Sequence, residues 1–135
     1  MVANPEKKDR TEERERPKNR HMEKPLPNNY CVFCEIIAHR EPAEILYEDE
    51  DVLIIRNVLR WVPVMLLSIP KTHMTQKELW TNGIAGKIAS IGAEIGSRYC
   101  PEGFRFVANF GHHAMQSQHH GHLHILGGTF LGTYA

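Results

Sequence analysis

The stretch HGHLHILGG, residues 120–128, decides how the last part of this 135-residue chain is organised. Polar and apolar residues alternate along it, which is typical of a β-strand with one buried face. Residues two apart in a strand share a face, so His120, His122 and His124 point to the same side. A solvated strand face is ordinarily filled by Thr, Lys or Glu. Three imidazoles on one face therefore indicate a binding or catalytic site.

The residues just before this strand add neutral hydrogen-bonding groups. The segment NFGHHAMQS, residues 109–117, begins with asparagine and ends with glutamine and serine. We predict that GHHAMQSQH, residues 111–119, is the polar loop that leads into the histidine strand. Near neutral pH, imidazole acts as a nucleophile, a general acid or a metal ligand, so the pattern alone leaves several chemistries open.

Upstream of the loop, the apolar spacing predicts an α+β domain. Its elements are a short N-terminal helix, an antiparallel meander of about five strands, and one long helix against one face. Ile84, Ile88, Ile91 and Ile95 form a single apolar stripe on the long helix, and glycines beside them allow a close approach to the sheet or to a second copy. The predicted elements are a helix in 31–41, strands in 44–51, 52–58 and 61–70, a helix in 75–100, and strands in 104–110 and 120–126.

The cysteine usage suggests a metal site. The chain has three cysteines, and Cys31 and Cys34 form a C-x-x-C pair whose two thiolates can reach one tetrahedral ion. A redox pair is the rival interpretation, but that motif belongs to a thioredoxin-like βαβ setting, which this pattern does not predict. Cys100 has no partner in the sequence, and we expect an ordinary core or surface cysteine.

Charge divides the chain into two parts. Residues 1–28 carry eight basic and six acidic residues with few apolar ones, which predicts a disordered charged tail ahead of a folded domain at 29–135. Two roles are predicted for this tail, a solubilising segment or an arm that wraps a dimer. A nucleic-acid-binding arm is less favoured, because the net charge of the tail is only +2. The whole chain has a net charge of zero, so no strong nucleic-acid signal exists.

No apolar run reaches about 18 residues and no signal peptide is evident, so we expect a cytoplasmic protein without a membrane partner.

The ordered motifs resemble the histidine-triad (HIT) family. HGHLHILGG fits its H-x-H-x-H pattern followed by two apolar residues, and NFGHHAMQS is similar to its phosphate-binding segment. CVFCEII, YEDEDVLIIRNV and SIPKTHM match upstream elements of the family in the same order. The resemblance covers about residues 30–128, and the LGG ending is similar to the hint branch of nucleoside phosphoramidases.

The resemblance implies a nucleotide hydrolase or transferase. His122 would attack the α-phosphorus of a nucleoside phosphoramidate or dinucleoside polyphosphate and form a nucleotidyl-histidine intermediate. His124 would stabilise the phosphate charge and assist proton transfer. His120 completes the predicted catalytic triad. The predicted nucleotide-binding residues are Asn109, Gln116 and Ser117 for the phosphate, Asn57 for the ribose, and Phe33, Ile36 and Ile55 for an apolar slot that takes a purine base. For Ile36 and Ile55, an ordinary core position is an equal alternative.

The resemblance also implies a metal and a second copy of the chain. The zinc-containing members of the family supply the ligand set Cys31, Cys34, His73 and His120, a closed Cys2His2 site that implies structural zinc. Such proteins pair as homodimers.

Three positions depart from the family pattern and put substrate preference in question. Met65 stands where the family has a histidine, Asn57 where it commonly has an aspartate, and Gly121 where it has a bulky apolar residue. A catalytically weak nucleotide-binding or scaffold protein is therefore the alternative function. The sequence assigns no role to His112, His113 and His119.

Overall fold

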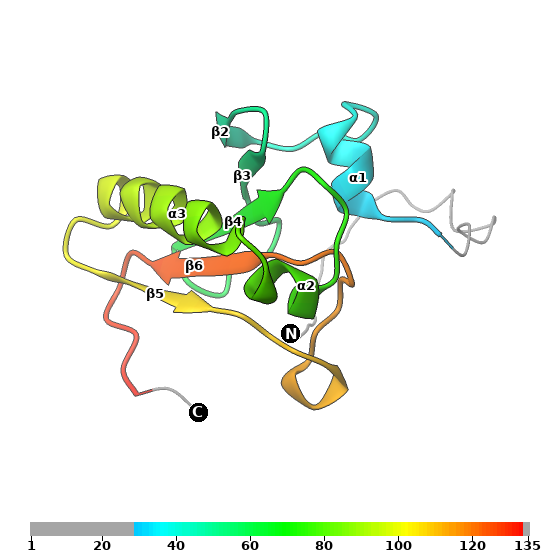
Figure 1. The fold of residues 1–135 in the computed structure, drawn as a ribbon. Helices are drawn as coiled ribbons and strands as arrows, with labels where there is room; N and C mark the ends of the chain where they lie inside the picture. The colour runs from blue at the N-terminus through cyan, green and yellow to red at the C-terminus, as the bar shows by residue number, and fades with distance from the viewer. Residues whose placement is uncertain (1–28, 134–135) are drawn as a thin grey trace, which may run out of the picture.

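The computed structural model describes residues 29–133 and contains three α-helices and one five-stranded antiparallel sheet in that range. The strand order is β2-β3-β4-β6-β5, which confirms the predicted α+β fold (Figure 1). The predicted charged tail, residues 1–28, lies outside the described residues. The elements are α1 (Val32–Ile37), β2 (Ile45–Glu48), β3 (Val52–Arg56), β4 (Val64–Pro70), α2 (Gln76–Thr81), α3 (Ala85–Tyr99), β5 (Phe104–Val107), the 3₁₀ turn η3 (His112–Ala114) and β6 (Leu123–Gly127).

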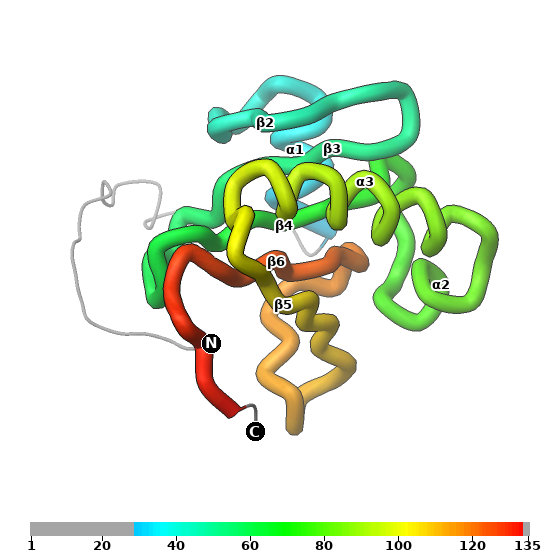
Figure 2. Tube along the Cα trace, turned by 90° about the vertical axis from the view of Figure 1, so that its left-hand side faces the viewer, coloured from blue at the N-terminus to red at the C-terminus, as the bar shows by residue number. Residues whose placement is uncertain are grey.

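The sheet is covered on both faces. In Figure 2, α3 lies in front of the sheet and α1 lies behind it. The core on the α3 side joins Ile88 and Ile95 of the predicted isoleucine stripe to Leu123 and Ile125 of β6. The core on the α1 side joins Phe33 and Ile36 to Leu53, Ile55, Leu67 and Ile69 of β3 and β4. Because both of their faces are covered, β3 and β4 read as nearly continuous apolar runs.

Two glycines let α3 lie close to the sheet. A Cβ atom at Gly96 would lie 3.0 Å from the ring of Phe104, and one at Gly92 would lie 3.4 Å from Cδ1 of Ile125. The predicted close approach is therefore made to the sheet of the same chain. Gly83 and Gly86 have open space at the corresponding position.

The predicted long helix is interrupted, so the segment forms two helices. Thr75 and Glu78 make a capping box that starts α2, and the backbone of Asn82 is extended at its end. The side-chain oxygen of Asn82 accepts the backbone N–H of Ile84 at 2.8 Å, which closes the turn before α3. The apolar period continues through this turn, so periodicity alone does not reveal the break.

The last strand begins three residues later than predicted. β6 starts at Leu123, whereas His120 makes an isolated bridge with Thr75, and the N–H of Gly121 donates to the carbonyl of Met74 at 2.7 Å. The start of the histidine stretch is therefore held by the segment that leads into α2.

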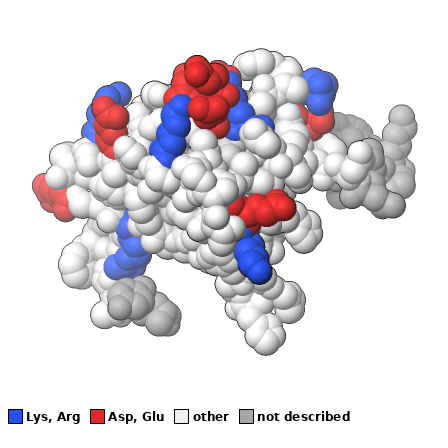
Figure 3. Space-filling view, viewed as in Figure 1, with Lys and Arg blue, Asp and Glu red and all other residues white. Residues whose placement is uncertain are grey.

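Charged side chains of opposite sign lie next to one another on the face shown in Figure 3. At the β2–β3 turn, Lys87 bonds Asp51 at 2.9 Å and Asp49 at 3.3 Å, and Lys71 bonds Glu48 at 2.6 Å. Among residues 29–133, no helix is long and apolar enough to cross a membrane.

Candidate functional site

The fold brings the three histidines of the 120–128 stretch into one cluster with Phe33 of α1. The ring centroids of His122 and His124 are 5.0 Å apart. Phe33 meets the ring of His120 edge-on at 5.7 Å and that of His122 at 5.2 Å. Although His120 and His122 precede the regular strand, the imidazoles gather as the alternating pattern predicts.

One tautomer of His122 follows from its hydrogen bonds. Its Nδ1 lies 2.8 Å from the backbone carbonyl of His120, which only accepts, so Nδ1 carries a proton. In the neutral ring, the lone pair is therefore on Nε2. Burial lowers the pKa of His122, and the bond to His120 partly opposes that shift. The imidazole is thus neutral near pH 7 and offers Nε2 as a nucleophilic atom.

The ring of His124 is also uncharged near pH 7. Burial, and then the neighbouring His122, lowers the pKa of His124 to about 4. The side chain is half-buried and lies opposite Leu67 of β4 and Val107 of β5 in the sheet register. A negatively charged ligand bound beside it would raise this pKa again and so increase the fraction of rings that carry a proton to donate near pH 7.

A second cluster lies at the start of α1, next to the histidines. The Nδ1 atom of His120 is 3.4 Å from Sγ of Cys31 and 3.6 Å from Sγ of Cys34, and Nδ1 of His73 is 3.2 Å from Sγ of Cys34. All four ligand atoms lie within 4.8 Å of one another. Ligands of one tetrahedral zinc ion are about 3.5 Å apart, so the cluster is able to hold a metal.

The protonation of His120 fits a ligand role. Its Nε2 lies 2.8 Å from the carbonyl of Pro70, so Nε2 carries the proton and the Nδ1 lone pair faces the two sulfur atoms. Burial lowers the pKa of His120 to about 4, which keeps the ring neutral. Burial and the neighbouring Cys31 raise the pKa of Cys34 to about 11, and a dication at the centre would reverse that shift. Cys31 and Cys34 are not joined in a disulfide.

A cavity of about 650 Å³ opens over the histidines, on the α1 side of the sheet. Its size suits a ligand as large as a nucleotide, and most of its lining is apolar. The predicted residues that line it are Phe33, Ile36, Ile55, Asn57, Asn109, Gln116, Ser117, His122 and His124. Ile36 and Ile55 each belong to the α1 core and also line the cavity, so their predicted contact with a base stays a prediction.

Two of the side chains that were predicted to bind the nucleotide already form hydrogen bonds within the protein. The side-chain oxygen of Asn57 accepts the N–H of Leu59 at 3.0 Å and so shapes the loop after β3. Gln116 accepts the N–H of Gly111 at 2.8 Å and donates to the carbonyl of Gln118 at 2.9 Å. Gln116 therefore braces the loop in which Ser117 is exposed to the cavity.

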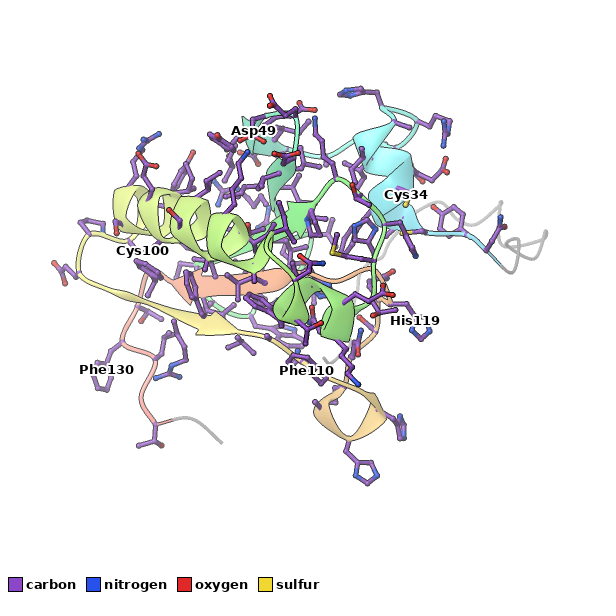
Figure 4. The ribbon with its side chains drawn as sticks, viewed as in Figure 1. Cys34, Asp49, Cys100, Phe110, His119 and Phe130 are labelled. Carbon is purple, nitrogen blue, oxygen red and sulfur yellow. The ribbon has the colours of Figure 1, made fainter. Side chains whose placement is uncertain are left out.

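The remaining histidines and Cys100 lie outside the cavity. His119 is exposed at the outer edge of the molecule (Figure 4), and His112 and His113 belong to the exposed turn η3. None of the three is among the residues that line the cavity. Cys100 is buried beside Gly127, so it is a core cysteine.

Sequence reasoning named Met65 as a departure from the family pattern but missed Trp61 and Gln76. Met65 and Trp61 both line the cavity, and the sulfur of Met65 accepts the backbone N–H of Trp61 at 3.0 Å. Gln76 is buried at the start of α2, and its side-chain oxygen accepts the backbone N–H of His122. No local sequence pattern indicates the Gln76 contact, because the two residues are 46 positions apart.

The comparisons with known proteins agree with this geometry. The HIT domain family model matches residues 38–131. The chain belongs to the HIT family. The predicted resemblance is thereby confirmed, and the C-x-x-C pair with its two histidines fits a zinc-type HIT protein.

Several relatives carry the same fold. The chain is 34% identical over 100 residues to "Protein hit" of Bacillus subtilis, covering 71% of the chain and 69% of that relative. A HIT family hydrolase from Clostridium thermocellum matches with a TM-score of 0.72 and 32% identity over 81% of the chain and 98% of its own. A zinc-bound histidine triad family protein from Mycobacterium smegmatis matches with a TM-score of 0.66 and 29% identity, over 78% and 79% of the two chains.

Proposed function

We propose that this HIT protein is a hydrolase that cleaves the α-phosphate bond of a nucleoside phosphoramidate or dinucleoside polyphosphate. The observation that carries the proposal is His122, whose Nδ1–H is held by the carbonyl of His120 while its ring lines the cavity. A relative named as a HIT family hydrolase supports the general activity.

In the first step, Nε2 of His122 attacks the α-phosphorus and a P–N bond forms. The bond from phosphorus to the leaving group breaks, and the leaving atom takes a proton. His124 is the donor on this path, because the phosphate charge raises its pKa once substrate is bound. The Nδ1–H bond to His120 stabilises the positive charge that develops on the attacking ring.

In the second step, a water molecule attacks the same phosphorus. The P–N bond to His122 breaks and a nucleoside monophosphate is released, while His124 accepts the proton of the water. Asn109 and Ser117 face the cavity with neutral groups for the phosphate oxygens. Neutral donors favour turnover, because they hold the charged product less tightly than lysine or arginine does.

The apolar part of the cavity suits the nucleoside. Phe33, Ile36, Ile55 and Asn57 line the cavity, and in this proposal the three apolar side chains contact a purine base while Asn57 bonds a ribose hydroxyl. The oxygen of Asn57 already accepts one N–H, so its amide group is the donor toward the sugar.

The metal in this proposal is structural zinc. Cys31, Cys34, His73 and His120 would fill a tetrahedral shell and leave no open position for a substrate. When bound, the ion fastens the first turn of α1 to the histidine segment, and it takes no part in the chemistry.

The assembly and location are proposals too. We infer a homodimer, because β5 is an edge strand that exposes Phe106, with the exposed Phe110 just beyond its end. The cytoplasm is the location that suits a site built on two thiolates.

The test is to incubate the full chain with an adenosine phosphoramidate and, separately, with a dinucleoside tetraphosphate. We expect release of AMP from at least one of them, and a loss of more than about 10³-fold in kcat for His122→Ala. His119→Ala is the matched control, because this exposed histidine lies outside the cavity. Release of AMP by His122→Ala at the wild-type rate would remove that residue from its role.

A catalytically weak nucleotide-binding protein is the second candidate. Met65 favours it, because the buried sulfur lies at the cavity end next to Leu126, where it offers no titratable group. Nucleotide binding without turnover of either substrate would select this candidate.

A further inference from the structure

We propose that Gln76 is a positioning residue that holds His122 and Asn109 at the separation that the reaction needs. The inference rests on the proposed function for the identity of the reacting groups. Its geometry stands on the structure alone. Gln76 is the first residue of α2 and is only 2% exposed.

The side-chain amide of Gln76 bonds three separate parts of the chain. Its oxygen accepts the backbone N–H of His122 at 3.0 Å and the indole N–H of Trp80 at 3.1 Å. Its nitrogen donates to the backbone carbonyl of Asn109 at 3.0 Å. The N–H groups only donate and the carbonyl only accepts, so a single orientation of the amide satisfies all three partners.

The surrounding backbone keeps this amide in place. The capping box of Thr75 and Glu78 fixes the start of α2, and the bonds to His122 and Asn109 hold the amide at both ends, while Trp80, one helical turn on, adds a third donor to the oxygen. Gly121 is the residue that lets the helix come this near. A Cβ atom there would lie 3.0 Å from the Thr75 carbonyl and 3.2 Å from the Gln76 oxygen. The glycine that departs from the family pattern thus makes room for this contact.

The two positioned residues lie on opposite ends of the loop that closes the cavity. Asn109 follows β5, His122 precedes β6, and both line the cavity. One amide that bonds both backbones fixes how far the attacking imidazole stands from a donor for the phosphate. Displacements of about 1 Å in such arrangements cost about 100-fold in rate. The nucleoside wall at Phe33 and Ile55 is built on other elements and does not depend on this bridge.

The test compares three variants of the full chain. Gln76→Met keeps the length of the side chain and removes the bridge, so we expect kcat to fall by about 10-fold to 100-fold with KM within about threefold of the wild type. Gln76→Glu retains the acceptor for His122 and loses the donor to Asn109 when its carboxyl is ionised, so we expect a smaller loss that grows as the pH rises. Trp80→Phe is the matched control. It removes the third bond but leaves the bridge, so its kcat should stay within about twofold of the wild type.

A second readout is independent of turnover. The ³¹P resonance of AMP bound to the protein should move in Gln76→Met and keep its wild-type position in Trp80→Phe. If the wild-type protein releases no AMP from either substrate, the proposed function is wrong. The ³¹P resonance would then still test whether Gln76 positions the two residues. Thermal unfolding of each variant shows that it is folded at the assay temperature.

Two results would overturn the inference. One is a folded Gln76→Met protein with a kcat within twofold of the wild type and an unmoved ³¹P resonance. The other is an equal loss of kcat in Trp80→Phe, which would mean that α2 acts only through its general packing. If Gln76→Met does not fold, Gln76→Glu decides the question at a pH where its carboxyl is ionised, because an unchanged kcat and resonance there would contradict the bridge to Asn109.

Discussion

The Nδ1–H of His122 donates to the backbone carbonyl of His120 at 2.8 Å, and the ring of His120 belongs to the cluster that could hold a metal ion. One short segment therefore joins this cluster to the proposed nucleophile. The ring of His120 faces the sulfur atoms, while its backbone sets the tautomer of the neighbouring imidazole. A change in this cluster should consequently shift the ring of His122, the proposed nucleophile, through the backbone.

Removal of the metal should lower stability first and activity second. We expect about one zinc ion per chain in the purified protein, and a melting temperature lower by at least about 10 °C after chelation, because the ion ties α1 to the histidine segment. Cys34→Ser should lose the ion and show the same shift. Cys100→Ser provides the cysteine control outside the cluster, and its metal content should equal that of the wild type. A metal-free wild-type protein would refute the site.

Met65→Leu should weaken substrate binding more than chemistry. The change conserves volume but removes the sulfur acceptor of the Trp61 N–H, which loosens the cavity wall beyond His124. We expect KM to rise by about twofold to fivefold and kcat to stay near the wild-type value, since a weak hydrogen bond is worth about 1 kcal/mol. Steady-state kinetics measure both. Met74→Leu is a matched control, because its sulfur also lies near a donor, Asn82, but away from the cavity.

Two glycines of α3 should respond differently to alanine. Gly86 has open space, so Gly86→Ala should raise the free energy of unfolding by about 0.5 kcal/mol through the lower entropy of the unfolded chain. At Gly96 the new methyl group would meet the ring of Phe104 at 3.0 Å, so the same change should give no gain or a loss. Denaturant titration of both variants checks the order, and a Gly96→Ala protein more stable than Gly86→Ala would contradict the packing.

Acid should destabilise the protein in part through Asp49. The hydroxyl of Tyr47, the backbone N–H groups of Asp51 and Val52, and Lys87 bond this carboxylate and hold its pKa well below the usual range. Because the folded-state pKa is depressed, the stabilisation is present above the unfolded-state pKa of about 4 and is lost as the pH falls below it.

Asp49→Asn should therefore flatten the fall in the free energy of unfolding between about pH 5 and pH 3. It should also lower stability at pH 7 by about 1 kcal/mol. Glu50→Gln, an exposed acid in the same turn, is the control and should keep the wild-type pH dependence. Parallel pH curves for Asp49→Asn and the wild type would contradict the assigned role of Asp49.

Local sequence patterns were sufficient to identify candidate site residues that lie close together in the sequence. The three histidines occupy every second position, and the two cysteines are three positions apart. Both sets could therefore be identified from the sequence without knowledge of the fold. Their ring contacts and the metal cluster follow from these spacings once α1 lies over the sheet. The strand assignments succeeded for the same reason, because burial imposes an apolar period on each strand.

Local pattern failed where a contact depends on residues far apart. The break between α2 and α3 was missed because Asn82 ends a helix whose apolar stripe continues beyond it. The late start of β6 was missed because His120 and Gly121 pair with Thr75 and Met74, which no short window contains.

The sequence by itself determined the candidate reactive groups of this protein, three alternating histidines and two cysteines one helical turn apart, and it indicated the family to which the chain belongs. Only the tertiary structure decided how these groups are held. The amide of Gln76 reaches His122 across 46 positions, and the carbonyl of Pro70 reaches His120 across 50. Such contacts arise when packing of the two cores brings distant segments together, and no local propensity encodes them.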